Sequence, residues 1–145
     1  PGNITEDAEF NIYCDPEAAN KVLSSGLDIK LCGLDITRET SIKREETEWL
    51  KGESPGERLI RELLDIVFRK LTDRNYFSLH DPIAVLSVLH PELIQWKTSK
   101  VSVVCDGENV GKTNDLDEPN GSVAIGIDID EDAAKAKIAE ILEQH

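Results

Sequence analysis

Apolar side chains recur at the spacing of an α-helix in several stretches of the chain. In the longest, which begins at Glu57, they fall on one face at intervals of three and four: Leu59, Ile60, Leu63, Leu64, Val67, Phe68 and Leu71. An Asp followed by Pro predicts the start of one helix from Asp15 to a stop at Gly26 and of another from Asp81 to Leu89. An alanine-rich amphipathic pattern predicts a last helix over Asp130–Gln144.

Other stretches carry the pattern of strands. Leu27–Thr37 is rich in apolar and β-branched residues and predicts a buried strand, and Val101–Cys105 predicts a shorter one. Near the C-terminus, apolar residues alternate with small or polar ones at the strand period of two: Val123, Ile125, Ile127 and Ile129. The polar residues of Ser41–Gly56 predict helix and loop near the surface, and Asp73–Leu79 predicts a loop.

The alternation of helices with short apolar strands predicts one α/β domain over residues 1–145, with a Rossmann-like open, mostly parallel sheet flanked by helices. A net charge of −13 disfavours nucleic acid and anionic membranes as partners, but not a neutral small molecule or a cation. No apolar run reaches the ~18–20 residues of a membrane span. No export signal opens the chain, and Pro1-Gly2-Asn3 is typical of the interior of a protein, so we expect a cytoplasmic location.

Cysteine and histidine usage excludes two further classes of site. The thiols of Cys14, Cys32 and Cys105 are odd in number and widely spaced, which predicts buried free thiols rather than a disulfide framework. The three histidines lack the spacing of a zinc site. Gly111-Lys112-Thr113 is similar to the end of a phosphate-binding loop, but Asp106 stands where that loop requires its first glycine.

Two dense motifs identify a family. Gly2-Asn3-Ile4-Thr5, followed by Ala8-Glu9-Phe10-Asn11 and Asp15-Pro16-Glu17-Ala18-Ala19, resembles the GN-x-T-x-x-AEFN-x-x-x-DPEAA block of nucleoside N-ribohydrolases. Leu79-His80-Asp81-Pro82 resembles their LHDP block. Between the two, Leu34-Asp35-Ile36-Thr37 resembles their LDVT strand end, although Arg38 follows where many members have His. The order and separation of these blocks make the chain similar to the C-terminal half of an inosine-uridine-preferring nucleoside hydrolase.

The resemblance implies a role for each motif residue in hydrolysis of the bond between ribose and base. Asn3, Glu9 and Asn11 would contact the ribose hydroxyls. Asp81 would touch the sugar and also ligate Ca²⁺, which prefers oxygen donors. His80 would be the catalytic acid that protonates the leaving base, a role suited to a group that titrates near neutrality.

Each of these residues also has a structural interpretation. Asp81 before Pro82 is an ordinary helix N-cap, just as Asp15 is. Glu9 and Asn11 are of residue types that also serve as loop-capping groups. A lone histidine such as His80 is more often a core or surface residue than a catalyst. The co-occurrence of the two motifs favours the functional interpretation.

A second signature of the family is missing from the chain. The family carries an Asp-rich DTDxGxDD turn that activates water and supplies most of the calcium ligands, and no similar segment occurs here. The densest acidic stretches, Asp115–Glu118 and Asp128–Asp132, have the wrong glycine placement. Because Ca²⁺ takes about six to eight oxygens, we expect the remaining ligands to come from an N-terminal half, as a separate chain or segment.

Two functions of different class therefore stand. The chain is either half of a ribonucleoside-hydrolysing enzyme, with a role in purine or pyrimidine salvage and a homo-oligomeric complete form, or a non-catalytic α/β binding or scaffold module. A fragment, a natural split subunit and a deliberate truncation all fit this incompleteness. Base preference stays open, with Phe68, Asn75 and Tyr76 as candidates for base contacts because they lie near His80 in sequence.

Overall fold

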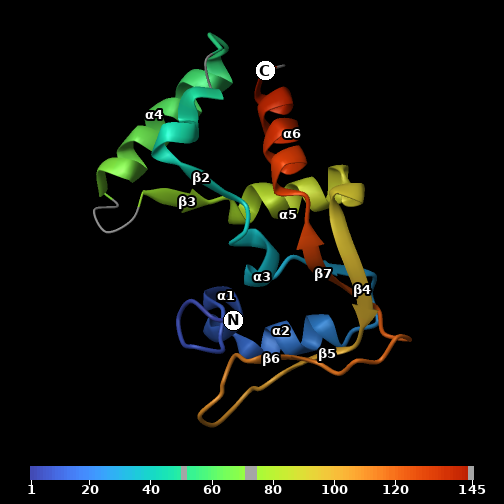
Figure 1. The fold of residues 1–145 in the computed structure, drawn as a ribbon. Helices are drawn as coiled ribbons and strands as arrows, with labels where there is room; N and C mark the ends of the chain where they lie inside the picture. Colours follow the sequence, from blue (N-terminus) through green and yellow to red (C-terminus); the bar gives the residue numbers. More distant parts are fainter. Residues whose placement is uncertain (50–51, 71–74, 144–145) are drawn as a thin grey trace. The chain divides into compact units, whose positions relative to one another are not determined.

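The computed structural model describes residues 1–49, 52–70 and 75–143 (Figure 1). Contacts within the chain divide it into two compact units, and each unit is made of two segments. The first unit comprises Pro1–Ile36 and Ile94–Asp128, and the second comprises Thr37–Leu93 and Ile129–His145. The expectation of one domain over residues 1–145 stays a prediction.

The first unit holds the main sheet. Its three strands are arranged in the order β1 (Ile29–Leu31), β7 (Val123–Ile129) and β4 (Ile94–Ser99). Strands β1 and β7 are parallel, with Ile29 opposite Val123. A separate antiparallel pair is formed by β5 (Val101–Val103) and β6 (Thr113–Asp115), and the helices are α1 (Phe10–Cys14), α2 (Pro16–Leu23) and α3 (Leu34–Thr37), whose last residue opens the second unit.

The core of the first unit lies between α2 and the strands. One cluster of buried residues there consists of Leu23, Val101, Val103 and Val123, with five partly buried apolar residues packed against it. Gly126 on β7 is also buried, and neighbouring side chains lie close to its Cα atom. A Cβ atom there would lie 2.6 Å from Ile36 Cδ1 and 3.2 Å from Ile94 Cγ2, so a larger residue would require these two side chains to shift.

The second unit is mainly helical. Strands β2 (Ser41–Lys43) and β3 (Tyr76–Ser78) form an antiparallel pair. The helices are η1 (Arg44–Trp49), α4 (Pro55–Lys70), α5 (His80–Leu89), η2 (Pro91–Leu93) and α6 (Glu131–Glu143). The core takes residues from most of these elements: Ile42, Leu64, Phe68, Leu79, Ile83, Leu86 and Ala134.

A capping box starts α4. The Ser54 hydroxyl accepts from Glu57 N at 3.2 Å and donates to the Glu57 carboxylate at 2.8 Å. The same carboxylate accepts from the backbone N–H of Gly52 at 3.0 Å. The Ser54 hydroxyl, together with the backbone N–H groups of Ser54 and Gly52 and the charge of Arg61, holds the pKa of Glu57 below its ordinary value.

The helices are the part of the sequence interpretation that the structure confirms best. Asp15 caps α2 by accepting from Ala18 N at 2.9 Å. Helix α4 covers the predicted amphipathic stretch and buries Leu64 and Phe68, whereas Leu59 and Leu63 are exposed. Helix α6 and strand β7 also lie where they were predicted. The predicted positions Leu71, Asp73 and Gln144 lie outside the described residues.

Several strand predictions were wrong. The strand predicted over Leu27–Thr37 ends at Leu31, and the LDIT segment is the helical turn α3. A short apolar run fits a strand or a buried helical turn equally well, and only tertiary packing decides between them. Strands β2 and β3 lie in segments predicted as helix and loop, and β4 was not predicted.

Two single-residue predictions also need correction. Helix α5 begins at His80 with Leu79 as its N-cap, so Asp81 lies in the first turn and is not the cap. The three cysteines are free, as expected, but Cys14 is exposed and the other two are only half-buried, so the prediction of buried thiols was wrong.

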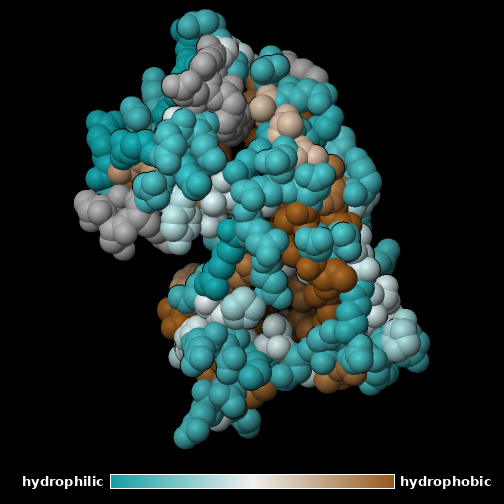
Figure 2. All heavy atoms as spheres, in the orientation of Figure 1, coloured by the Kyte–Doolittle hydropathy of each residue, from teal (hydrophilic) through white to brown (hydrophobic). Residues whose placement is uncertain are grey.

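Hydrophilic residues cover most of the face drawn in Figure 2. Within the described part of the chain, no helix combines the length and the apolar character needed to cross a membrane.

Candidate functional site

The first motif folds into a tight loop closed on one carbonyl group. The Ala8 oxygen accepts from the backbone N–H groups of Asn3 at 3.0 Å and Ile4 at 3.2 Å, and Ala8 N donates to the Thr5 hydroxyl at 2.9 Å. A Cβ atom at Gly2 would lie 2.2 Å from the Thr5 carbonyl oxygen and 2.5 Å from Ala8 N. The Gly and Thr of the motif therefore shape the loop that presents its polar side chains.

The loop brings Asn3, Glu9 and Asn11 together at the start of α1. The Asn3 Oδ1 atom accepts from Phe10 N at 2.8 Å. Glu9 is the N-cap of α1, and its Oε2 accepts from Asn11 N at 2.8 Å and Ile12 N at 3.2 Å. The Asn11 amide donates to Glu9 Oε1 at 3.1 Å. The three residues predicted to contact ribose thus form a cluster at the first turn of α1: Glu9 caps the helix and is hydrogen-bonded to Asn11, and Asn3 is hydrogen-bonded to the backbone of Phe10 between them.

The second motif lies in the second unit, at the start of α5. His80 is exposed, and its Nδ1 lies 2.8 Å from the hydroxyl of Thr37, at the end of α3. Thr37 is only 3% exposed. The backbone of the same segments is joined where Leu79 N donates to Thr40 O at 2.9 Å. Sequence reasoning assigned no role to Thr37, although the LDIT block that contains it was recognised.

Asp81 follows His80 in the first turn of α5 and is also exposed. A carboxylate in the first turn is favoured by the helix dipole. Asp81 also lies at the edge of an apolar groove of about 340 Å³ whose other lining residues come from α5 and α6: Pro82, Val85, Leu86, Leu89, Ile138, Ile141 and Leu142. The carboxylate is therefore the polar end of a largely hydrophobic surface.

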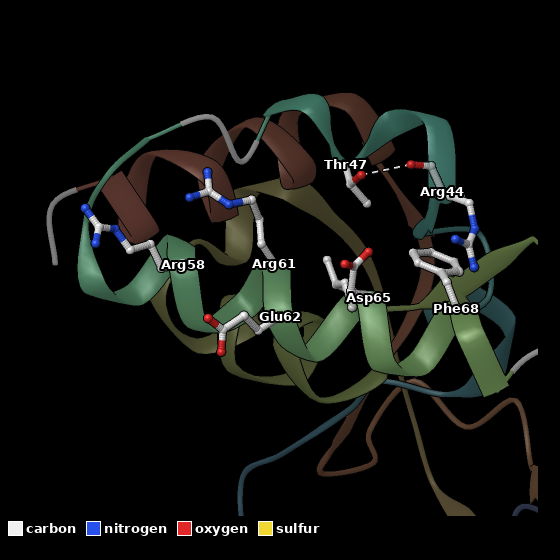
Figure 3. Close-up of a pocket in the computed structure, with 8 residues that line it drawn as sticks. Arg44, Thr47, Arg58, Arg61, Glu62, Asp65 and Phe68 are labelled. Carbon is white, nitrogen blue, oxygen red and sulfur yellow. Dashed lines mark hydrogen bonds between the residues drawn. The ribbon is translucent and has the colours of Figure 1, made fainter.

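A second hollow, of about 330 Å³, lies along α4 and η1 (Figure 3). Its charged lining comes mostly from α4, with Arg58, Arg61, Glu62 and Asp65. Arg44 lies over the ring of Phe68, its guanidinium carbon 5.2 Å from the ring centroid. None of the five candidate site residues lines this pocket: Asn3, Glu9, Asn11, His80 and Asp81.

The pocket bears on the residues that sequence proximity nominated for base contacts. Phe68 is only 4% exposed, and the Arg44 guanidinium lies over its ring, so the ring offers little free surface to a base. Asn75 and Tyr76 are exposed at the start of β3. A role for any of the three in base contacts stays a prediction.

A calcium ion needs several oxygen ligands placed around one point. Among the described residues, no group of three or more acidic, histidine or cysteine side chains is placed to hold a metal ion. Asp81 supplies one carboxylate, whereas Ca²⁺ takes about six to eight oxygens. The described residues of this chain therefore do not by themselves fit a calcium ion.

The comparisons with known proteins point to one family. The model of the family described as inosine-uridine preferring nucleoside hydrolase matches residues 1–136. The pyrimidine-specific ribonucleoside hydrolase RihA of Salmonella newport (strain SL254) is 35% identical over 139 residues, which cover 88% of this chain and 45% of that protein. The RihA of Citrobacter koseri is 34% identical with the same coverage. The chain thus spans a little less than half the length of these curated relatives.

Solved structures agree on the fold. A plant nucleoside hydrolase, the PpNRh1 enzyme, aligns with a TM-score of 0.83 and 26% identity over 99% of this chain and 50% of its own. The purine-preferring ribonucleoside hydrolase from Gardnerella vaginalis aligns with a TM-score of 0.85 at 22% identity, also over 99% of this chain and 50% of its own. The predicted α/β class is confirmed by these likenesses.

Proposed function

Because the chain belongs to the inosine-uridine preferring nucleoside hydrolase family, we propose that it forms part of an active site that hydrolyses the N-glycosidic bond of ribonucleosides. The observation that carries the proposal is the cluster of Asn3, Glu9 and Asn11, three motif residues whose side chains all make hydrogen bonds at the start of α1. The proposed substrate is the whole class of ribonucleosides, because the motifs contain proposed ribose contacts and no residue that selects a base.

In this proposal the cluster binds ribose. The Glu9 carboxylate and the two asparagine amides offer acceptors and donors in a fixed arrangement, which suits the vicinal hydroxyls of the sugar. Hydrolysis gives the ring positive charge as the base departs, and a nearby carboxylate stabilises that charge. The hydrogen bonds that Glu9 already makes fix its orientation before substrate binds.

His80 is proposed as the acid that protonates the departing base, and Asp81 as a ribose contact. We propose that Asp81 also gives one ligand to a calcium ion, with the remaining ligands from the half of the family fold that this chain does not span. The same proposal makes that half, as a segment or a separate chain, a required partner, and includes a homo-oligomeric complete enzyme.

A non-catalytic module is the second candidate. It is favoured by the cap that Glu9 forms on α1, because this structural role is by itself a sufficient reason for a carboxylate at that position. It is also favoured by the lack of a group of three metal-ligating side chains among the described residues. A binding or scaffold module would retain the motif loop for its shape and would show no turnover under any conditions.

The test compares two leaving groups in the active enzyme, which in this proposal is this chain together with the half of the family fold that it does not span. Replacing His80 with Ala should slow hydrolysis of natural ribonucleosides by ~10²–10⁴-fold, because their bases leave poorly without a proton. A nitrophenyl riboside, whose leaving group departs as a stable anion, should be hydrolysed at nearly the original rate. Replacing Asp81 with Ala should slow both substrates, since sugar positioning serves every leaving group. Equal losses on both substrates for the His80 variant would show that His80 is not the acid.

A further inference from the structure

The hydrogen bond between Thr37 and His80 joins residues that lie 43 positions apart in the chain. Both residues belong to the second unit. The bond runs from a buried hydroxyl at the end of α3 to the ring of an exposed residue at the start of α5. Close by, the backbone bond from Leu79 N to Thr40 O fixes the path of the chain into α5. The backbone of the motif is thus held by one contact and the imidazole ring by another.

We propose that Thr37 is a positioning residue for His80: the Thr37 hydroxyl holds Nδ1 and so sets the orientation in which the imidazole ring approaches the leaving base. This inference rests on the proposed role of His80 as the acid. An exposed imidazole without such a contact would rotate among several rotamers, and only some of them would point a ring nitrogen at the base.

A hydroxyl suits this task better than a carboxylate would. It accepts a hydrogen bond from a protonated Nδ1 and donates one to an unprotonated Nδ1, so it keeps the ring in place in either form. A carboxylate accepts only, and would favour the charged ring over the neutral one. A ring that gives up a proton in each turnover needs a partner that tolerates both forms.

A matched control lies three residues further along the chain. Thr40 is fully buried, and its hydroxyl has no hydrogen-bond partner among the described residues. A change of Thr40 to Val therefore removes a hydroxyl from an equally buried threonine in the same segment without touching the contact to His80. The pair separates a loss of positioning from a general disturbance of packing.

The first measurement is kinetic, in the active enzyme. Thr37→Val should lower kcat on a natural ribonucleoside roughly ten- to hundredfold with KM changed by less than about twofold, because the acid is misplaced while ribose contacts remain. Hydrolysis of a nitrophenyl riboside should be nearly unchanged. Thr37→Ser, which keeps the hydroxyl, should restore most of kcat, and Thr40→Val should behave as the original enzyme. Equal kcat for Thr37→Val and Thr40→Val would overturn the proposal.

The second measurement observes the ring itself. Long-range proton–nitrogen spectra resolve histidine side chains, of which this chain contributes three, and His80→Gln identifies the signal of interest. The ring-nitrogen shifts of His80 should change in Thr37→Val and stay unchanged in Thr40→Val. If Thr37→Val does not fold, Thr37→Ala takes its place in both measurements. Unchanged His80 shifts would overturn the proposal, and so would changed shifts with unchanged kcat.

The two experiments also separate this inference from the proposed function. If His80→Ala leaves natural substrates unaffected, the role of His80 as the acid fails, and with it any positioning role for Thr37 in catalysis. If His80→Ala shows the expected contrast between leaving groups but Thr37→Val does not, the proposed function stands and only the positioning inference fails.

Discussion

Replacing Glu9 with Ala tests whether this residue is more than a helix cap. Asp15 offers a matched comparison, because it caps the next helix, α2, and has no proposed contact with ribose. Asp15 accepts one backbone hydrogen bond, from Ala18 N at 2.9 Å. Glu9 accepts two, from Asn11 N and Ile12 N, and a third from the Asn11 amide. The two variants therefore remove similar structural contacts but different proposed functions.

The expected losses of stability follow from these contacts. Removing an N-cap costs about 1 kcal/mol, which is the loss expected for Asp15→Ala. Glu9→Ala removes a cap and a side-chain hydrogen bond worth about 1 kcal/mol more, so we expect about 2 kcal/mol in total. Urea unfolding of both variants measures these differences directly.

The expected losses of activity differ much more. A hydrogen bond between the Glu9 carboxylate and a ribose hydroxyl is worth about 1.5–3 kcal/mol, so kcat/KM of Glu9→Ala should fall roughly ten- to hundredfold. Asp15→Ala should keep kcat/KM within about twofold at a temperature where both variants remain folded. If both variants lose kcat/KM to the same extent, Glu9 is a cap and nothing else, and the ribose-binding cluster has to be abandoned.

Two further predictions concern charge and metal. The Lys97 ammonium, 2.8 Å away, with hydrogen bonds from Ser99 and the backbone of Asp117, lowers the pKa of Asp115 to about 2. Because this pKa lies below that of the unfolded chain, the ionised carboxylate stabilises the fold above pH ~4, and the contribution is lost as pH falls through about 2. The difference in unfolding free energy between the original protein and Asp115→Asn should therefore be constant near neutrality and shrink towards pH 2, and a difference independent of pH would contradict this account. For calcium, calorimetry on the 145-residue chain should detect no submicromolar binding, since Asp81 is the one matched carboxylate in the described residues; tight binding by a verified single species would refute the donor count.

The helices could be predicted from sequence because their signals are local. Asp15-Pro16 carries its own cap and first turn, and Ser54 with Glu57 forms a capping box within four residues. Strands depend instead on partners distant in sequence. Strand β1 is only three residues long and pairs with β7, and nothing within Leu27–Thr37 specifies that this pairing stops at Leu31. Leu34, Ile36 and Thr37 are buried by tertiary packing, which a linear pattern does not contain.

The candidate site shows the same division. Asn3, Glu9 and Asn11 could be identified from the sequence motif. Local hydrogen bonds within nine residues bring these three to the start of α1. The contact of Thr37 with His80 could not be predicted, because it joins residues 43 positions apart and depends on tertiary packing. The roles of Glu9, His80 and Asp81 stay predictions that the variants above are designed to test, and the ribose contacts of Asn3 and Asn11 stay predictions as well.

The loop closed on the Ala8 carbonyl makes the length of the first motif a physical constraint. Asn3 and Ile4 both donate to that one oxygen, and Gly2 fits against Thr5 and Ala8 with no room for a side chain. An inserted or deleted residue between Asn3 and Glu9 would break this closure and separate the two side chains, even though every motif residue remained in the chain. The number of residues between Asn3 and Glu9 is therefore fixed by the fold of the loop. In a search for proteins with the same chemistry, this spacing should be held constant, whereas the long interval to His80 can vary with the elements it contains.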